Sequence, residues 1–363
     1  MKVTLKRTED QVALLKAMAS KNRDTAYEAQ QALADFIGPV LAEVINNAPG
    51  LSNLFEGFSF EADDNPSIPL DLYTDIVDED YIRVYSNAAP GGLASSTVTP
   101  IQQEQKITTG RLDSAVDFDK KFAARSRLDV VSKTFGRIGQ EVLLKAERTS
   151  AGLILGVLQS NYADNVLEVD NTGGSKNLVT LDDFNKLLTK AKRLNTSWAG
   201  GTPENRGRGV TDLIVSPEIV ESLRAMAYNP INIHGSNTDI PATDEMRNRI
   251  YQNGGIPEFF GLGIMELYEL GIGQRFNAVF EELDTGNNFD PAKQDLVIAL
   301  DKSRSSLIRG TQLDGDTGSE LSLIADDQYT ARQSRIGFYG SKEEGRMVLN
   351  DKTILGLNVQ MIA

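Results

Sequence analysis

The stretch 56–125 constrains the fold most, because it is too polar to build a core and too long for an ordinary loop. Glycine, proline, serine, aspartate and threonine accumulate in it, as at 89–92. Alternating runs at 81–85 and 105–108 flank this polar middle and are typical of strands. A structureless loop of such length is unusual within a compact domain. The sequence therefore predicts an extended hairpin that projects as an arm, with residues 86–104 at its tip.

Helical patterns lie on both sides of this stretch. Residues 8–47 carry apolar side chains at spacings of three and four, and Thr8 stands at a capping position. Gly38-Pro39 is expected to break or kink this helix. The longest helical pattern runs over 126–161, where Ser126 and Asp129 have capping-box spacing and four interior glycines indicate breaks or close backbone contacts. Its apolar positions include Leu128, Val131, Phe135, Ile138 and Val142.

The N-terminal helix carries a large apolar stripe. This stripe could dock on its own domain or reach a neighbouring subunit, and its position before the arm favours the neighbour. Residues 1–25 contain six basic and three acidic residues, which would suit an inner surface near DNA. The stripe consists of Leu33, Phe36, Ile37, Val40, Leu41 and Val44.

The remainder of the chain mixes helices and strands. Thr180 and Asp183 have capping-box spacing before a helix, and Pro217 begins another. Apolar runs predict strands at 213–215, 264–267 and 296–300, and the last fifth of the chain alternates as β-structure. Together these patterns predict an α+β fold.

Composition excludes most catalytic chemistry. The chain has one histidine and no cysteine, so disulfides, thiolates and cysteine zinc sites are excluded. A Ser-His-Asp triad would have to use His234, which stands in a turn-like stretch without a nucleophile elbow. We therefore predict no catalytic, cofactor-binding or metal-ligating residues, no cofactor and no enzymatic activity.

The net charge of −14 over 363 residues argues against a nucleic-acid-coating protein and fits a chain that stays soluble at high concentration. No apolar run has the length of a signal peptide core or a membrane span, so a cytosolic origin without membrane contact is expected.

Two stretches have the spacing of ligand-binding motifs but lack residues that those motifs require. Residues 340–347 have the spacing of a phosphate-binding loop, but Arg346 and Met347 stand where lysine and serine or threonine are needed, and a charged turn is expected instead. Residues 314–320 alternate acids as calcium loops do, yet Gly318 occupies a ligand position, so a polar loop is expected.

The order of several segments resembles major capsid proteins of tailed bacteriophages of the Hong Kong 97 type. In that family a long helix is the spine of a peripheral domain, the arm before it is the extended loop, and a strand-Ser-Pro-helix unit belongs to the axial domain. Beyond the long helix, the segments that carry the resemblance are Leu-Asp-Asp-Phe at 181–184, Leu-Ile-Val-Ser-Pro-Glu at 213–218, Phe-Phe-Gly-Leu-Gly-Ile-Met-Glu at 259–266, Asp-Leu-Val-Ile-Ala-Leu-Asp at 295–301 and Arg-Ile-Gly-Phe-Tyr-Gly at 335–340.

The resemblance implies an α+β fold of the Hong Kong 97 capsid type, with an N-terminal arm, an extended loop, a peripheral domain and an axial domain. It also implies a shell protein that assembles as hexamers and pentamers into an icosahedral head around double-stranded DNA, in the virion and in host cytoplasm during assembly. Implied partners are copies of itself, portal, scaffolding or decoration proteins, and loosely held DNA. The implied ranges are 1–55 for an N-terminal helical arm, 56–125 for the extended loop and start of the peripheral domain, 126–176 for the peripheral domain with its spine, 177–312 for the axial domain, 313–345 for the return to the peripheral domain and 346–363 for a terminal strand.

Two alternatives remain open at this stage. An encapsulin-like nanocompartment would share the fold but hold enzyme cargo rather than DNA. A soluble α/β enzyme could use carboxylates alone, and the residues considered for that role are Asp63, Asp64, Asp78 and Asp80.

Overall fold

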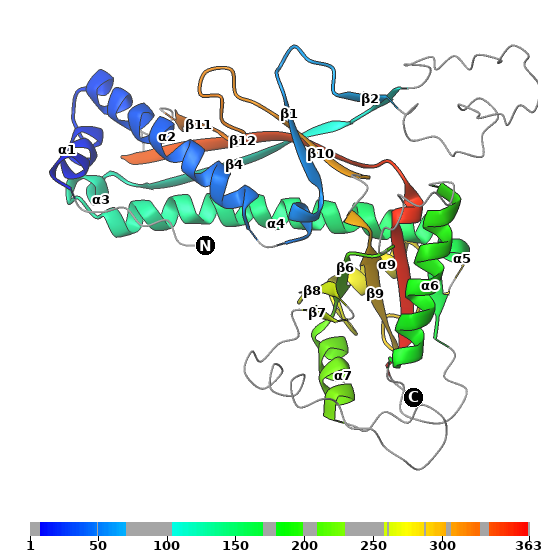
Figure 1. The fold of residues 1–363 in the computed structure, drawn as a ribbon. Coiled ribbons are helices and arrows are strands. Elements are labelled where there is room, and N and C mark those ends of the chain that lie inside the picture. The colour runs from blue at the N-terminus through cyan, green and yellow to red at the C-terminus, as the bar shows by residue number, and fades with distance from the viewer. Residues whose placement is uncertain are drawn as a thin grey trace, which may run out of the picture. The chain divides into compact units, whose positions relative to one another are not determined.

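The chain divides into two compact units, each with its own sheet and core. The first unit contains Met1–Ile68, Lys106–Ser150 and Leu307–Met347, and the second contains the rest. Helices and sheets in both units confirm the α+β prediction. The computed structural model describes residues 8–48, 50–69, 104–169, 179–198, 209–228, 258–259, 261–286, 288–302, 306–326 and 334–361 (Figure 1).

The first unit begins with helices α1 (Glu9–Met18) and α2 (Arg23–Asn46). The Thr8 side chain caps α1 by accepting a hydrogen bond from the Gln11 backbone, as predicted. The prediction that Gly38-Pro39 breaks the helix is wrong, because α2 continues through Pro39. Pro39 lies on the exposed face of α2, where water can reach the carbonyl that proline leaves without a donor.

Helix α4 (Leu128–Ser160) is one unbroken element that runs from the first unit into the second. The interior glycines do not interrupt it, and a Cβ built at Gly136, Gly152 or Gly156 meets no atom of the rest of the described chain within 4 Å. The predicted capping box does not form, because Asp129 pairs instead with Arg127 at 2.9 Å. Short helices α3 (Lys120–Ala124) and η1 (Leu51–Leu54) complete the described helices of the first unit.

A five-stranded sheet supports these helices. Its order is β1-β10-β12-β11, and β4 pairs along the other edge of β12. Phe338 on β12 contacts Phe135 of α4 with tilted rings, their centroids 4.8 Å apart, so α4 packs directly on the sheet. The strands are β1 (Glu56–Phe60), β4 (Thr109–Asp119), β10 (Leu307–Gln312), β11 (Ser322–Asp326) and β12 (Arg335–Val348).

The continuity of β12 corrects one expectation. Residues 340–347 form no turn, because they lie within this single strand and pair with β4 as far as Gly345. Alternation over that stretch reflects one buried and one outward face.

A separate strand pair marks the base of the predicted arm. β2 (Ser67–Pro69) pairs with β3 (Glu104–Lys106), so the two ends of the described chain on either side of 70–103 lie side by side. The tip and the predicted strand at 81–85 lie outside the described residues.

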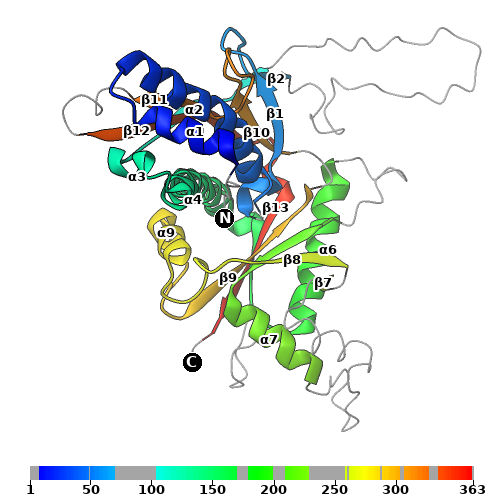
Figure 2. The same ribbon diagram turned by 90° about the vertical axis from the view of Figure 1, so that its left-hand side faces the viewer.

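The second unit contains a six-stranded sheet of order β5-β13-β9-β6-β8-β7. Helices α6 and α7 contribute apolar side chains to one core with β6, β9 and β13. Figure 2 shows both helices beside this sheet. The predicted capping box before α6 is present, since Thr180 N donates to Asp183 at 2.8 Å. The elements are α5 (Tyr162–Asn165), β5 (Val166–Glu168), α6 (Leu181–Trp198), β6 (Asp212–Val215), α7 (Pro217–Tyr228), β7 (Glu258–Phe259), β8 (Leu262–Glu266), α9 (Arg275–Leu283), β9 (Gln294–Leu300), η3 (Asp351–Thr353) and β13 (Ile354–Gln360).

Candidate interaction surface

The apolar stripe predicted on α2 divides into two faces. Its first face, Leu33, Ile37 and Leu41, is at most 5% exposed and packs in the core of its own unit with α4, β11 and β12. The expectation that the whole stripe packs on a neighbouring subunit is therefore wrong for these residues. Helical periodicity explains the split, because positions 36, 40 and 44 are each three residues beyond 33, 37 and 41 and therefore point about one sixth of a turn away from them.

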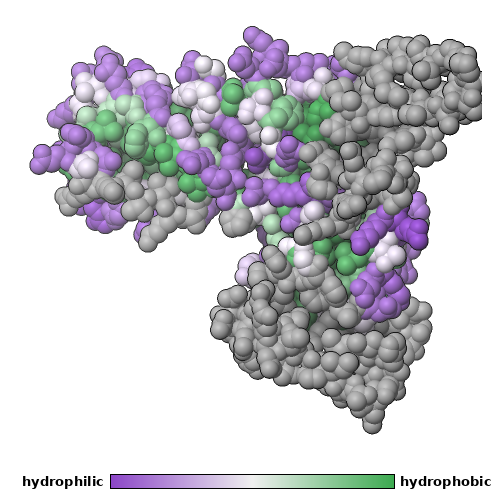
Figure 3. Space-filling view, in the orientation of Figure 1, coloured by the Kyte–Doolittle hydropathy of each residue, from purple (hydrophilic) through white to green (hydrophobic). Residues whose placement is uncertain are grey.

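The second face of α2 is open to solvent. Phe36 is 61% exposed, Val40 44% and Val44 37%. They are spaced four residues apart and form one line, which we call the outer stripe. Hydrophobic surface gathers over α2 in the space-filling view (Figure 3). Several large apolar side chains exposed in one line indicate an interaction surface rather than scattered surface residues.

A groove lies beside the outer stripe. Its volume is about 300 Å³, and we call it the α1–α2 groove. Gln11 Oε1 in its wall is buried and accepts no hydrogen bond within the described part of the chain. The groove is lined by Asp10, Gln11, Leu14, Leu15, Ala32, Leu33, Phe36 and Leu128.

The charges that α2 itself carries beyond Arg23 have one sign. After Arg23, every charged residue of α2 is acidic, and each of them is exposed. Asp10 adds a carboxylate from the groove itself. A complementary partner would therefore be apolar and basic. The acidic residues of α2 are Asp24, Glu28, Asp35 and Glu43.

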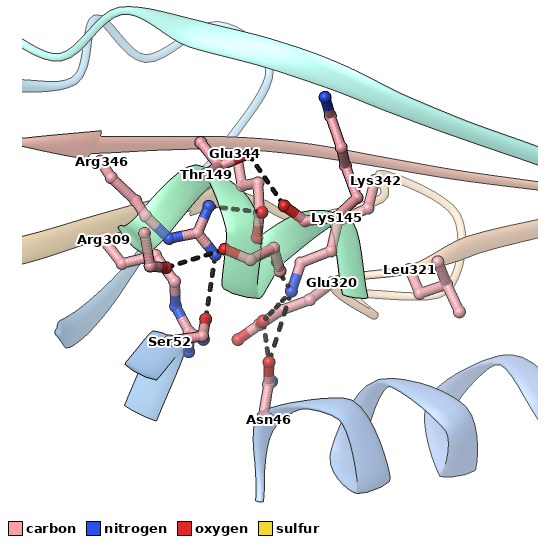
Figure 4. A network of polar contacts seen from close by, with 12 residues as sticks. Asn46, Ser52, Lys145, Thr149, Arg309, Glu320, Leu321, Lys342, Glu344 and Arg346 are labelled. Carbon is pink, nitrogen blue, oxygen red and sulfur yellow. Dashed lines mark hydrogen bonds and ion pairs between the residues drawn. The ribbon is translucent and has the colours of Figure 1, made fainter. Parts of the chain in front are cut away.

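A buried ion cluster lies near the C-terminal end of β12 (Figure 4). Glu344 pairs with Arg346 at 2.6 Å and with Lys342 at 3.4 Å, and the side chains of all three are 3% exposed. Asn46, at the end of α2, donates to Glu320 at 2.8 Å and accepts from Lys342 at 3.4 Å. The cluster thereby joins α2 to β12.

Electrostatics in the cluster follow from burial. Burial lowers the pKa of Lys342, against the effect of its acidic neighbours. Burial acts to raise the pKa of Glu344, but Arg346 and Lys342 together hold it below its ordinary value. The cluster is not expected from the sequence, because residues 340–347 are interpreted there as a charged turn and the side chains of such a turn are exposed to solvent.

A second buried polar group lies in the second unit. Ser216 donates to Asp295, and its hydroxyl also accepts from the backbone of Ile219 at 3.2 Å, which caps α7. Asn277 donates to Asp295 at 3.3 Å. Burial raises the pKa of Asp295. These hydrogen bonds hold α7 and α9 against β9.

Of the residues considered for catalysis, the structure describes only Asp63 and Asp64. Asp64 accepts the backbone N–H of Glu61 at 3.1 Å in an exposed turn beside Asp63. His234, Asp78 and Asp80 lie outside the described residues. Asp314 accepts hydrogen bonds from Asp316 and Thr317, which confirms the expected polar loop.

The described part of the chain contains neither a metal-ligand cluster nor a membrane-spanning helix. Its residues form no group of three or more metal-ligating side chains placed to hold an ion. No helix within it combines the length and apolarity that a membrane crossing requires.

Several solved structures are similar to this chain. The capsid of the cyanophage P-SCSP1u has 14% identity and a TM-score of 0.48, with 84% of this chain and 86% of that chain covered. The Microbacterium phage Oxtober96 structure has 13% identity, a TM-score of 0.49 and coverages of 85% and 90%. The holo-SrpI encapsulin complex from Synechococcus elongatus PCC 7942 has 12% identity, a TM-score of 0.45 and coverages of 86% for both chains.

At these identities the likeness concerns the fold. No protein-family model and no curated protein matches the chain.

Proposed function

We propose that the chain is a shell-forming major capsid protein, which self-assembles as hexamers and pentamers into an icosahedral head around double-stranded DNA. The observation that carries this proposal is the outer stripe of α2, with Phe36 61% exposed. Fully burying one such side chain stabilises an assembly by about 1.5–3 kcal/mol. Covering Phe36, Val40 and Val44 with a second copy would therefore drive association.

The arrangement of elements supports the same function. In this proposal α4 is the spine within 126–176, and 56–125 is the extended loop that rises from the β2–β3 pair. The N-terminal arm covers 1–55, the axial domain 177–312, the return 313–345 and the terminal strand 346–363. The net charge of −14 suits a lining that holds packaged DNA loosely. Portal, scaffolding or decoration proteins are the further partners, and the virion is the location.

Electron microscopy of the purified chain tests the proposal. Closed particles of uniform size are expected, and particles from infected or producing cells should contain nuclease-resistant DNA. Particles filled with a single cargo protein would instead assign the chain to an encapsulin-like compartment. A chain that stays monomeric under conditions where authentic particles persist would contradict any shell function.

A further inference from the structure

The α1–α2 groove requires an occupant of defined chemistry. Its floor is apolar through Leu14, Leu33 and Leu128, and the exposed charges of α2 beyond Arg23 are acidic. An occupant must therefore offer apolar side chains and positive charge together. An acidic or purely polar segment would meet repulsion or leave the floor uncovered.

One segment of this chain has that composition. Residues 1–7 read Met-Lys-Val-Thr-Leu-Lys-Arg, with Val3 and Leu5 between three basic residues and no acid. The longer stretch 70–103, which also lies outside the described residues, contains five acids and one base. In an extended segment Val3 and Leu5 would share one side, and Lys2 and Lys6 the other.

The groove of the same chain is a poor fit for this segment. Thr8 has an extended backbone (φ −96°, ψ 159°) and leads directly into α1, whose residues Asp10 and Gln11 already line the groove. Returning along α1 would require a reversal, which takes about four residues. A reversal over residues 4–7 would place Leu5 within the turn, so Val3 and Leu5 could not both cover the floor. A second copy has no such restriction, because seven residues span up to about 25 Å.

We propose that residues 1–7 of one copy dock in the α1–α2 groove of a second copy. Val3 and Leu5 cover the floor near Phe36, and the basic residues face Asp10 and the acids of α2. This inference rests on the self-association in the proposed function and specifies one contact within it. Exchange of such segments links neighbouring copies.

Disulfide mapping tests the contact directly, because the chain has no cysteine. Thr4→Cys and Ala32→Cys are made in separate chains, which preserves Val3, Leu5 and Phe36. Ala32 is exposed and lines the groove. The two variants are mixed, assembled and oxidised. We expect a disulfide-linked dimer of the two chains, and a mixture of Thr4→Cys with Asp316→Cys, an exposed position in the 313–320 loop, serves as the control.

The possible outcomes separate the proposal from its alternatives. A dimer above the control level supports docking on a second copy. A double variant carries Thr4→Cys and Ala32→Cys on one chain. If its main product is an intrachain disulfide, the proposal is overturned, because the segment then folds back on its own chain. If microscopy shows normal particles and no cross-link exceeds the control, this contact is wrong while the shell function stands.

Charge reversal supplies a second readout. Lys2→Glu with Lys6→Glu should lower the cross-link yield about tenfold by placing like charges against the acidic rim. Lys16→Glu with Lys21→Glu changes the net charge equally and should leave the yield near that of the parent pair. Equal loss in both double variants would show a general charge effect and overturn the proposal. Far-UV circular dichroism establishes that each variant is folded.

Discussion

Glu147 on α4 accepts a hydrogen bond from the backbone N–H of Leu51 at 2.8 Å, and its other oxygen accepts from Ser52 at 3.4 Å. The carboxylate thereby caps η1 at the end of the N-terminal helices. Glycine at position 50 allows this approach, because a Cβ built there lies 1.8 Å from Glu147 Oε1. One carboxylate therefore fixes where the chain leaves α2 and enters β1.

Gly50→Ala should destabilise the first unit by about 1.5–3 kcal/mol, the value of hydrogen bonds to a charged group. The backbone of Gly50 is extended, so the cost arises from displacing Glu147 rather than from strain. Urea unfolding measures it. In a Glu147→Ala background the same substitution should cost much less, and additive effects of the two changes would contradict this coupling.

Gly136→Ala should have the opposite effect. Nothing lies within 4 Å of a Cβ at this position in α4, and alanine is favoured over glycine in a helix interior by about 1 kcal/mol. The urea midpoint of the first unit should rise. A decrease would show that the glycine has a packing role that the described contacts do not contain.

Lys342→Met should destabilise the first unit by about 3–5 kcal/mol, because Glu344 and Glu320 lose a buried partner. Lys302→Met is the control, since Lys302 is exposed and lies in the second unit. Comparable losses in the two variants, measured by urea unfolding, would contradict a special role for the cluster.

The same cluster predicts an acid dependence. The pKa of Glu344 is held below its ordinary value of 4.5, so its stabilising contribution is complete above that value and is lost as the pH falls through the lower folded pKa. Unfolding measured from about pH 6 to about pH 3 should show a steep loss that is reduced in Glu344→Gln. An unchanged slope in the variant would assign the acid loss to other carboxylates.

The elements themselves could largely be predicted from the sequence. Apolar spacing in α4, the cap at Thr8 and the Thr180–Asp183 box are local patterns, and the structure contains all three. Predictions failed where a local sequence rule depends on which face of the element is exposed. Pro39 stays within α2 because its face is exposed and its freed carbonyl can reach water.

The buried clusters could not be predicted, because they depend on register between distant segments. Lys342 meets Asn46 only because β12 pairs along the sheet on which α2 packs. The periodicity of apolar residues likewise could not predict which residues of the α2 stripe are buried and which are exposed. Both faces are apolar, and only the position of β11 and α4 decides which is covered.

Phe36→Asp and Leu41→Asp should separate the two faces of α2. Leu41 is fully buried in the core of its own unit, so Leu41→Asp places an unpaired carboxylate there and should unfold the first unit. Phe36 is 61% exposed, so Phe36→Asp should change the unfolding free energy by less than about 1 kcal/mol. Assembly should nevertheless fail or weaken, because the outer stripe loses its largest apolar side chain. Thr25→Asp, at an exposed position near the start of the same helix, controls for added charge. Sedimentation of folded variants measures assembly, and normal particles of normal stability from Phe36→Asp would show that the outer stripe is not an intersubunit contact.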